Sequence, residues 1–215
     1  MRRRRASIIA REKWATGHSS YLARMLNSQA GMALATSRVQ RVIDLLDLCP
    51  GRRYLDIGCG TGAYADLVAQ KAGLEEPPVT MDLVGQMNGA VDLTGWPEKL
   101  PFGDASFDCI TSFYFLRRFD DDVCRAYAQE IGRVLAPGGS ALMLEFAPVR
   151  SGILNRFHER LVSFGCAEVD LRGWGRLAAL YTEAGFDAID RVNVGPFVLP
   201  PIPRVGVLLR RAPEQ

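Results

Sequence analysis

The chain has 215 residues, of which 48% are hydrophobic and 23% charged; these proportions are typical of one globular domain and exclude an intrinsically disordered chain. The formal net charge of +2 gives no electrostatic case for a nucleic-acid partner. Two histidines, His18 and His158, are too few for a multi-histidine metal site, and we expect no bound metal. Five cysteines without a CxxC pair argue against a disulfide framework, so a reducing, cytoplasmic location is expected.

Predicted helices and strands alternate along most of the chain. Apolar residues recur at helical spacing over 39–48, and Pro50-Gly51 then ends this helix. Further helices are expected at 63–72, with Gly73 as the stop, and at 123–135, 153–164 and 174–184, and strands at 53–57, 79–83, 89–93, 107–113 and 140–146. The Pro-Gly-Gly sequence at 137–139 predicts a turn that ends a helix. Two apolar runs at 188–194 and 205–209 predict a C-terminal hairpin, and the alternation as a whole predicts a parallel α/β sheet.

A glycine-rich loop follows the first predicted strand, with the sequence Asp-Ile-Gly-Cys-Gly-Thr-Gly at residues 56–62. Glycines allow a tight turn from strand to helix and let a ligand approach the main chain below a helix N-terminus. The loop also fits a turn without a ligand, and Gly58 to Ala63 fit the G-x-G-x-x-A dinucleotide fingerprint. Asp56 argues against a dinucleotide, because a carboxylate is unfavourable beside a pyrophosphate but suits a cationic amino-acid group. The rest of the chain is also short for a dehydrogenase with its own substrate region.

Three further motifs follow in order: Leu-Pro-Phe-Gly-Asp-Ala-Ser-Phe-Asp at 100–108, Arg-Val-Leu-Ala-Pro-Gly-Gly at 133–139 and Leu-Glu-Phe at 144–146. With the glycine loop, they make residues 54–148 resemble the class I methyltransferases (methyltransferase type 11), most closely the ubiquinone and menaquinone biosynthesis C-methyltransferases. The resemblance implies a Rossmann-like α/β fold, with a mostly parallel seven-stranded sheet, flanking helices and a C-terminal antiparallel hairpin. It also implies S-adenosyl-L-methionine as the cofactor and a small, apolar or aromatic, quinone- or lipid-like acceptor.

The same resemblance predicts the organisation of the chain and its cofactor contacts. Residues 1–37 are expected to form a basic, helical lid, and residues 38–215 the methyltransferase domain. The expected contacts are Asp56, Gly58, Cys59, Gly60, Asp82, Leu83, Asp92, Leu93 and Ser112. The glycine loop matches the segment that holds the methionine end of the cofactor, and Asp82 matches the carboxylate that accepts both ribose hydroxyls. Asp92 and Leu93 match the pair that reads the adenine, although Asp92 is equally compatible with a turn.

The chain departs from the family pattern between Asp82 and Asp92. Only nine residues separate them, too few for a strand–helix–strand unit, so the usual crossover helix is expected to be deleted or replaced by a loop at 84–90. The Trp-Pro-Glu-Lys insert at 96–99 is a candidate for the missing wall of the adenine pocket.

The catalytic candidates are less clear than the cofactor contacts. Many O-methyltransferases place a histidine after the fourth strand, but residues 112–118 contain none. The candidates are therefore Tyr114, Arg117 and His158, with Glu145 and Tyr181 as further candidates for a general base. Arg117 matches the Leu-Arg pair of the quinone-type family and would stabilise a phenolate or enolate, with a surface salt bridge as the alternative. His158 lies in a helix where this superfamily often builds its acceptor pocket, and a purely structural role is its alternative.

Arginines crowd the start of the chain, at residues 2–5 and 11, with Lys13 nearby. One interpretation is a solvated terminus; the other is peripheral contact with an anionic membrane surface, for which Trp14 and Tyr21 would be suited. No apolar region of an export signal follows the arginines, and no apolar run approaches transmembrane length.

Three functional classes stay open from the sequence. The first is a methyltransferase that acts on a small-molecule acceptor. The second is an NAD-dependent oxidoreductase with a Rossmann fold, which would bind NAD and ignore S-adenosylhomocysteine. The third is a non-catalytic member of the methyltransferase fold that serves as a binding subunit and turns over no acceptor.

Overall fold

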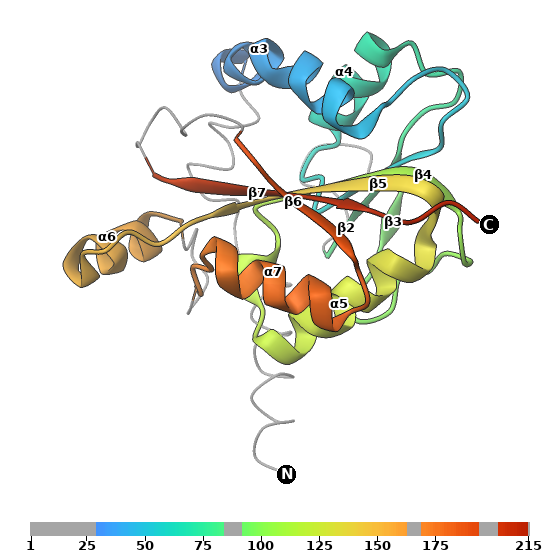
Figure 1. Cartoon of the computed structure of the whole chain (residues 1–215). Coiled ribbons are helices and arrows are strands. Elements are labelled where there is room, and N and C mark those ends of the chain that lie inside the picture. The colour runs from blue at the N-terminus through green and yellow to red at the C-terminus, as the bar shows by residue number, and fades with distance from the viewer. Residues whose placement is uncertain (1–28, 84–91, 163–168, 194–201, 215) are drawn as a thin grey trace.

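The structure is a computed structural model that describes residues 29–83, 92–162, 169–193 and 202–214. A seven-stranded sheet in the order β3-β2-β1-β4-β5-β7-β6 crosses the molecule (Figure 1). Its strands are β1 (Tyr54–Ile57), β2 (Val79–Asp82), β3 (Leu93–Thr94), β4 (Phe107–Phe113), β5 (Leu135–Phe146), β6 (Ala188–Val192) and β7 (Arg204–Arg210). The first five strands pair in parallel, and β7 is antiparallel to both β5 and β6. The expected mixed sheet with a C-terminal hairpin is therefore confirmed.

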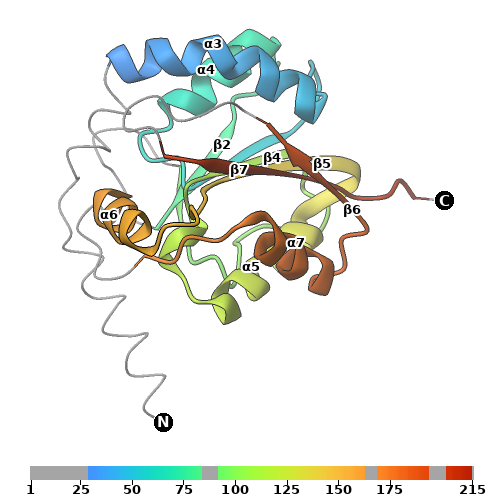
Figure 2. The same ribbon diagram turned by 60° about the vertical axis from the view of Figure 1, so that its left-hand side comes forward.

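Helices cover both faces of the sheet. They are α3 (Gln29–Leu46), α4 (Ala63–Ala72), α5 (Asp121–Val134), α6 (Gly152–Val162) and α7 (Trp174–Glu183), with a short 3-10 helix η1 (Leu116–Arg118) after β4. In Figures 1 and 2, α3 and α4 lie on one face and α5 and α7 on the other. Each pair of helices packs against the sheet in a separate hydrophobic core. Val39 of α3 and Val68 of α4 belong to one core, and Ile131 of α5 and Leu177 of α7 belong to the other. Within the described ranges, no helix combines the length and the apolar character needed to span a bilayer.

Most expected elements appear within a residue or two of their expected ends. The helix at 63–72 and the strand at 107–113 are confirmed at both ends, and Gly73 stops α4 with a φ of 69° that suits glycine. In the described residues, the third strand β3 covers Leu93–Thr94, and the expected part at 89–91 lies outside the described ranges.

The expected helix-ending turn at 137–139 was wrong. Strand β5 starts at Leu135, directly after α5, and pairs with Phe107 before its register shifts and resumes at Ser140 opposite Cys109. Gly138 adopts a φ of 73°, and its N–H donates to the main chain of the C-terminal tail at Arg211. The Pro-Gly-Gly sequence is thus an irregularity within β5, because the tail provides the hydrogen-bond partner that a free turn would lack.

Helix α3 runs without a break across residue 37, where the boundary between lid and domain was expected. Its C-terminal half packs Val39, Val42 and Leu46 against the sheet. Residues 1–28, which hold most of the expected lid, lie outside the described ranges. The division of the chain at residue 37 stays a prediction.

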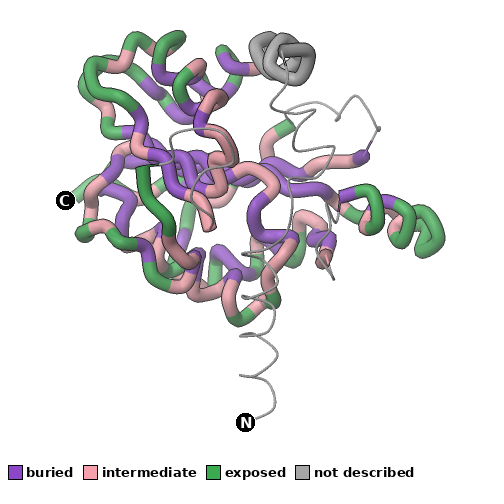
Figure 3. Tube along the Cα trace, turned by 180° about the vertical axis from the view of Figure 1, so that it is seen from behind, coloured by how far each residue is buried: buried purple, intermediate pink, exposed green. Residues whose placement is uncertain are grey.

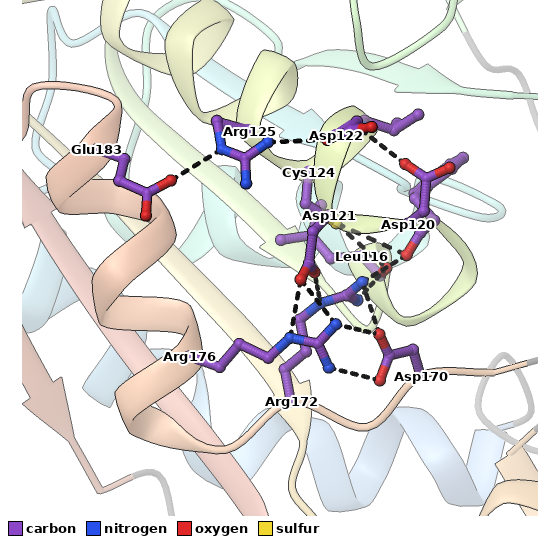
Figure 4. Close-up of polar contacts among 12 residues, drawn as sticks. Leu116, Asp120, Asp121, Asp122, Cys124, Arg125, Asp170, Arg172, Arg176 and Glu183 are labelled. Atoms are coloured by element: carbon purple, nitrogen blue, oxygen red, sulfur yellow. Dashed lines mark hydrogen bonds and ion pairs between the residues drawn. The ribbon is translucent and has the colours of Figure 1, made fainter.

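A buried arginine ties the segment after β4 to the segment before α7 (Figure 4). Arg172, only 2% exposed, donates to the carbonyl oxygens of Leu116 and Phe119 at 3.0 and 2.6 Å. Its guanidinium also pairs with Asp121 at 2.9 Å and with Asp170 at 3.0 Å. Arg176 pairs with the same two carboxylates at 2.8 and 2.7 Å, but only Arg172 reaches the two carbonyls, so Arg172 fixes the course of η1.

We expect Arg172→Ala to lower the free energy of unfolding by about 2–4 kcal/mol, because the buried carbonyls of Leu116 and Phe119 each lose a donor. Arg125→Ala is the matched control: its pairs with Asp122 and Glu183 are exposed, so we expect a much smaller loss. Urea unfolding followed by circular dichroism measures both variants. An equal loss of unfolding free energy in Arg172→Ala and Arg125→Ala would show that the hydrogen bonds of Arg172 do not hold this region together.

Candidate functional site

The candidate site lies at the carboxyl ends of β1, β2 and β4. Strand β1 pairs in parallel with β2 on one side and with β4 on the other. In such open sheets, ligands bind where the strand order reverses, since the following helices leave on opposite faces. In this chain α4 covers one face and α5 the other, which places the reversal between β1 and β4.

The loop between β1 and α4 takes a shape that depends on glycine. Gly58, Gly60 and Gly62 have φ values of 76°, 63° and 76°, in the left-handed region. The N–H of Gly58 donates to the carbonyl of Met81 at 2.8 Å, so the loop is held against the end of β2. A Cβ on Gly58 would lie 2.6 Å from the Phe115 ring, which brings the segment after β4 against the glycine loop.

Asp82 lies beside this loop at the end of β2. Its Oδ2 accepts a hydrogen bond from the N–H of Gly60 at 2.8 Å, and its Oδ1 accepts one from the N–H of Leu83 at 2.6 Å. Each carboxylate oxygen can accept more than one hydrogen bond, so both can also take a ribose hydroxyl. The Gly60 contact shows that the two sequence motifs come together in one place.

Asp56 is a buried carboxylate, 4% exposed, behind the glycine loop. Its Oδ1 accepts a hydrogen bond from Thr111 Oγ1 at 2.6 Å, and the same Thr111 hydroxyl forms a hydrogen bond with the Tyr54 hydroxyl at 2.7 Å. Burial raises the pKa of Asp56 to about 7, the Thr111 hydrogen bond opposes the rise, and the charge of Asp82 adds to it. A cationic ligand group nearby would relieve this cost by favouring the ionised form.

The other expected cofactor contacts are less uniform. Cys59 belongs to the same loop, and its N–H donates to Met81 at 3.3 Å. Ser112 is buried in β4, in register with Ile57, and its hydroxyl lies close enough to the buried Tyr127 hydroxyl to oppose the rise of the Tyr127 pKa. Its place beside Ile57 puts it next to the start of the glycine loop. These residues fit the amino-acid end of the expected cofactor.

Asp92 has a clear structural role. Its Oδ2 accepts hydrogen bonds from both the N–H and the hydroxyl of Thr80, each at 2.8 Å, and its own N–H donates to that hydroxyl at 3.1 Å. The carboxylate therefore fastens the start of β3 to β2, while Leu93 is 39% exposed. Contacts of this pair with adenine stay a prediction, and the loop expected at 84–90 lies outside the described residues.

The Trp-Pro-Glu-Lys insert at 96–99 forms a tight turn next to the ribose carboxylate. Trp96 and Lys99 form an antiparallel bridge, and the N–H of Gly95 donates to the carbonyl of Asp82 at 3.1 Å. A Cβ on Gly95 would lie 3.1 Å from the sulfur of Met81. The insert therefore lies beside the end of β2, and its role as a wall of the adenine pocket stays a prediction.

Two catalytic candidates meet at Phe146, at the end of β5. The Tyr114 ring stacks on Phe146 with centroids 4.3 Å apart, and the guanidinium of Arg117 lies 5.8 Å from the same ring centroid. Tyr114 has a φ of 58°, and its hydroxyl accepts a hydrogen bond from Arg204 at 2.7 Å. Burial raises the pKa of Tyr114 despite the Arg204 charge, so the phenol suits hydrogen-bond donation better than proton removal.

Arg117 and His158 are both buried. The alternative of a surface salt bridge for Arg117 was wrong, since the residue is 3% exposed and its Nε donates to the carbonyl of Val162 in α6 at 3.2 Å. His158 lies one turn earlier in α6, is 6% exposed, and its Nδ1 has no hydrogen-bond partner among the residues that the structure describes. Arg117 therefore joins α6 to the end of β5 at Phe146.

Glu145 and Tyr181, the further candidates for a general base, are both buried. The Oε1 of Glu145 accepts a hydrogen bond from the N–H of Leu116 at 2.6 Å, which ties the carboxylate to the start of η1. Burial raises its pKa, and the charge of Arg117 opposes the rise. Tyr181 is 1% exposed in the core between α5 and α7, and burial raises its pKa well above the ordinary value.

Sequence reasoning missed three residues of the site. Thr111 and Thr80 hold the two carboxylates Asp56 and Asp92, and Arg204 reaches Tyr114 from the distant strand β7. The two threonines could have been found from the sequence. Buried strands of a parallel sheet are mostly apolar, so a hydroxyl inside such a strand needs a hydrogen-bond partner. No local signal pointed from Arg204 to a residue ninety positions earlier.

Comparisons with known proteins agree with this geometry. A family model described as a methyltransferase domain matches residues 55–143. Demethylmenaquinone methyltransferase of Deinococcus radiodurans is 38% identical over 116 residues, which cover 47% of this chain and 46% of that protein. The ubiquinone/menaquinone biosynthesis C-methyltransferase UbiE of Teredinibacter turnerae is 33% identical over 136 residues, 57% of this chain and 53% of that protein. The matches thus span about half the length of these curated relatives.

Among solved structures, the PH0226 protein of Pyrococcus horikoshii has the same fold, with a TM-score of 0.63 over 86% of this chain and 93% of that one at 17% identity. The matched residues 55–143 contain the glycine loop, Asp82 and the segment around Tyr114. The family match, the relatives and the strand order agree with one another: residues 55–143 are similar to the methyltransferase domain of S-adenosylmethionine-dependent methyltransferases, and the described sheet has the fold of PH0226.

Proposed function

We propose that this chain transfers a methyl group from S-adenosylmethionine to a small aromatic, quinone-like acceptor. The observation that carries the proposal is the hydrogen bond between Gly60 and Asp82, which joins the two cofactor motifs within 2.8 Å. The similarity to demethylmenaquinone and ubiquinone/menaquinone methyltransferases supports the quinone-like acceptor. An NAD-dependent oxidoreductase and a non-catalytic binding subunit are less favoured, because the family match and the buried Asp56 both suit a cationic cofactor.

In this proposal the residues around the glycine loop hold the cofactor. Asp82 accepts the ribose hydroxyls, and Asp56 together with the loop at 58–60 receives the amino-acid end. Ser112, in register with Ile57, borders the same end of the ligand. Asp92 and Leu93 border the adenine, with Asp92 using the oxygen that does not bind Thr80. S-adenosylmethionine supplies a methyl group on a sulfonium, which leaves in an in-line displacement once donor and acceptor are aligned.

The residues around Phe146 would bind and activate the acceptor. Tyr114 donates a hydrogen bond to an acceptor oxygen, and Arg117 stabilises the phenolate that makes a ring carbon nucleophilic. His158 Nδ1 accepts the proton that the methylated carbon loses. Phe146 holds the first two side chains by stacking and by a cation–π contact, so these two groups face one acceptor.

The basic segment at the start of the chain belongs to the same proposal. Its arginines would meet anionic headgroups, which suits an acceptor that resides in a bilayer. Residues 1–28 lie outside the described part of the structure, so this contact rests on the sequence alone.

Replacement of Asp82 by alanine should weaken the binding of S-adenosylhomocysteine at least about tenfold, since two hydroxyls lose a charged acceptor. Isothermal titration calorimetry measures the change, and Asp187→Ala, which removes an exposed carboxylate, is the matched control. The melting temperature of both variants shows whether the fold survives. Unchanged affinity in a folded Asp82→Ala protein would remove Asp82 from the cofactor site, and NAD binding without sulfonium binding would favour the oxidoreductase.

Cofactor binding should depend on the ionisation of Asp56. Its pKa of about 7 in the free protein lies above the ordinary carboxyl value, and a bound ammonium group would lower it. Binding therefore releases a proton below pH 7, and affinity should fall by up to about tenfold per pH unit as the pH is lowered from 7 towards 5. The Asp56→Asn variant should bind more weakly and show a flat profile in this range. A steep profile that persists in Asp56→Asn would assign the dependence to another group.

The reaction itself is tested with labelled S-adenosylmethionine and a naphthohydroquinone that carries an isoprenoid tail. We expect label on a ring carbon, identified by mass spectrometry and NMR. The His158→Gln variant should lose at least about a hundredfold in kcat, because the proton acceptor is gone, while cofactor affinity stays at the wild-type value. Full activity in His158→Gln would leave His158 a structural residue, and label on oxygen would redefine the reaction as O-methylation.

A further inference from the structure

Helix α6 exposes an apolar face that the fold leaves uncovered. Ile153 is 76% exposed and Phe157 57%, and Leu154 and Leu161 are 42% and 36% exposed. Of the large hydrophobic residues in the described ranges, only Leu93 is exposed in the same way outside this helix. At about 100° per residue, the four side chains of α6 fall within one arc of about 100°. The helix is thus amphipathic with its second apolar face turned outward.

The opposite face of α6 holds it to the body of the domain. His158 and Val162 are buried, and Val162 belongs to a small core with Phe146. The carbonyl of Val162 accepts the hydrogen bond from Arg117. In Figures 1 and 3, α6 extends away from the sheet at the side where β5 ends, and most of its length is exposed. The uncovered face therefore lies next to the residues assigned to the acceptor.

The charges around this face are mostly positive. Arg156 and Arg160 are exposed and, by helical angle, border the apolar arc on the side of Ile153. Arg150, just before the helix, is also exposed. Glu159 points about 100° or more away from the edge of the arc, towards the opposite side of the helix. Three guanidinium groups thus accompany an apolar stripe, a combination that matches the phosphates and the acyl boundary of an anionic bilayer.

We propose that α6 is a membrane-docking helix of this chain, which lies flat on an anionic lipid surface. Ile153, Phe157 and Leu161 enter the acyl boundary, and Arg156 and Arg160 contact lipid phosphates. Eleven residues give the helix a length of about 16 Å, which suits an interfacial orientation and is too short for a span. Because Val162 touches the acceptor residues, docking brings the open edge of the site to the bilayer. The purpose of the contact rests on the proposed quinone-like acceptor, but the contact itself does not.

The test measures co-sedimentation of the full chain with vesicles, without cofactor or acceptor. One set contains phosphatidylcholine with phosphatidylglycerol, and the other phosphatidylcholine alone. The wild-type chain should bind the anionic set at low salt. The double variant Ile153→Ser/Phe157→Ser should weaken this binding at least about tenfold, because it removes two apolar side chains that would enter the acyl boundary. Both side chains are solvent-exposed, so their replacement leaves the core intact. Calorimetry with S-adenosylhomocysteine on the same variant shows that the fold and the cofactor site survive, so a failed docking proposal is distinguished from a failed methyltransferase proposal.

A charge variant and two controls separate the alternatives. Arg156→Glu with Arg160→Glu should abolish anionic selectivity, whereas Arg41→Glu with Lys71→Glu, an equal charge change on α3 and α4, should keep most of it. The proposal would be overturned if both α6 double variants bound anionic vesicles as well as the wild-type chain does and only deletion of residues 1–13 abolished the binding. Docking would then be assigned to the N-terminal segment. No vesicle binding, together with self-association that the Ile153/Phe157 variant abolishes, would overturn the proposal in favour of a second copy of the chain.

Discussion

The parallel pairing of β1 between β2 and β4 is the constraint on which the rest of the molecule depends. Since the chain leaves β1 towards one face and β4 towards the other, the carboxyl ends of these strands stay uncovered by the helices. Everything assigned to the cofactor follows a strand end at this edge. The contact between Gly58 and the Phe115 ring shows how tightly the two sides of the reversal are joined, because no side chain other than hydrogen fits at residue 58.

Buried polar groups give the two halves of the site different characters. On the cofactor side, the hydrogen bond that Asp56 accepts within the described residues comes from the neutral Thr111 hydroxyl, so its charge is poorly compensated and can respond to a cationic ligand. On the acceptor side, Glu145 holds the N–H of Leu116, and Arg172 holds the carbonyl of the same residue. This segment is therefore fixed from both directions before any acceptor binds, as precise alignment for methyl transfer requires.

The site and α6 form one continuous arrangement along the edge of the sheet. The ribose carboxylate lies at the end of β2, the glycine loop follows β1, the acceptor candidates surround Phe146, and α6 begins six residues beyond it. Arg117 belongs to both of the last two regions through its contact with Val162. A methyltransferase whose acceptor is apolar gains from such an order, because the acceptor can pass from a lipid surface to the reacting groups without crossing water.

The sequence by itself determined the strand and helix order, the glycine loop and the carboxylate at the end of β2, because these depend on local periodicity, on glycine conformation and on motifs with fixed spacing. It left open what Asp92 and Arg117 do, and it misplaced the Pro-Gly-Gly segment. Only the tertiary structure decided these points, since Thr80, Val162 and the C-terminal tail supply partners from other elements. The exposed face of α6 is also decided by the tertiary structure. An amphipathic pattern shows that a helix has two faces, and only the packing of the domain determines which face is buried in the core.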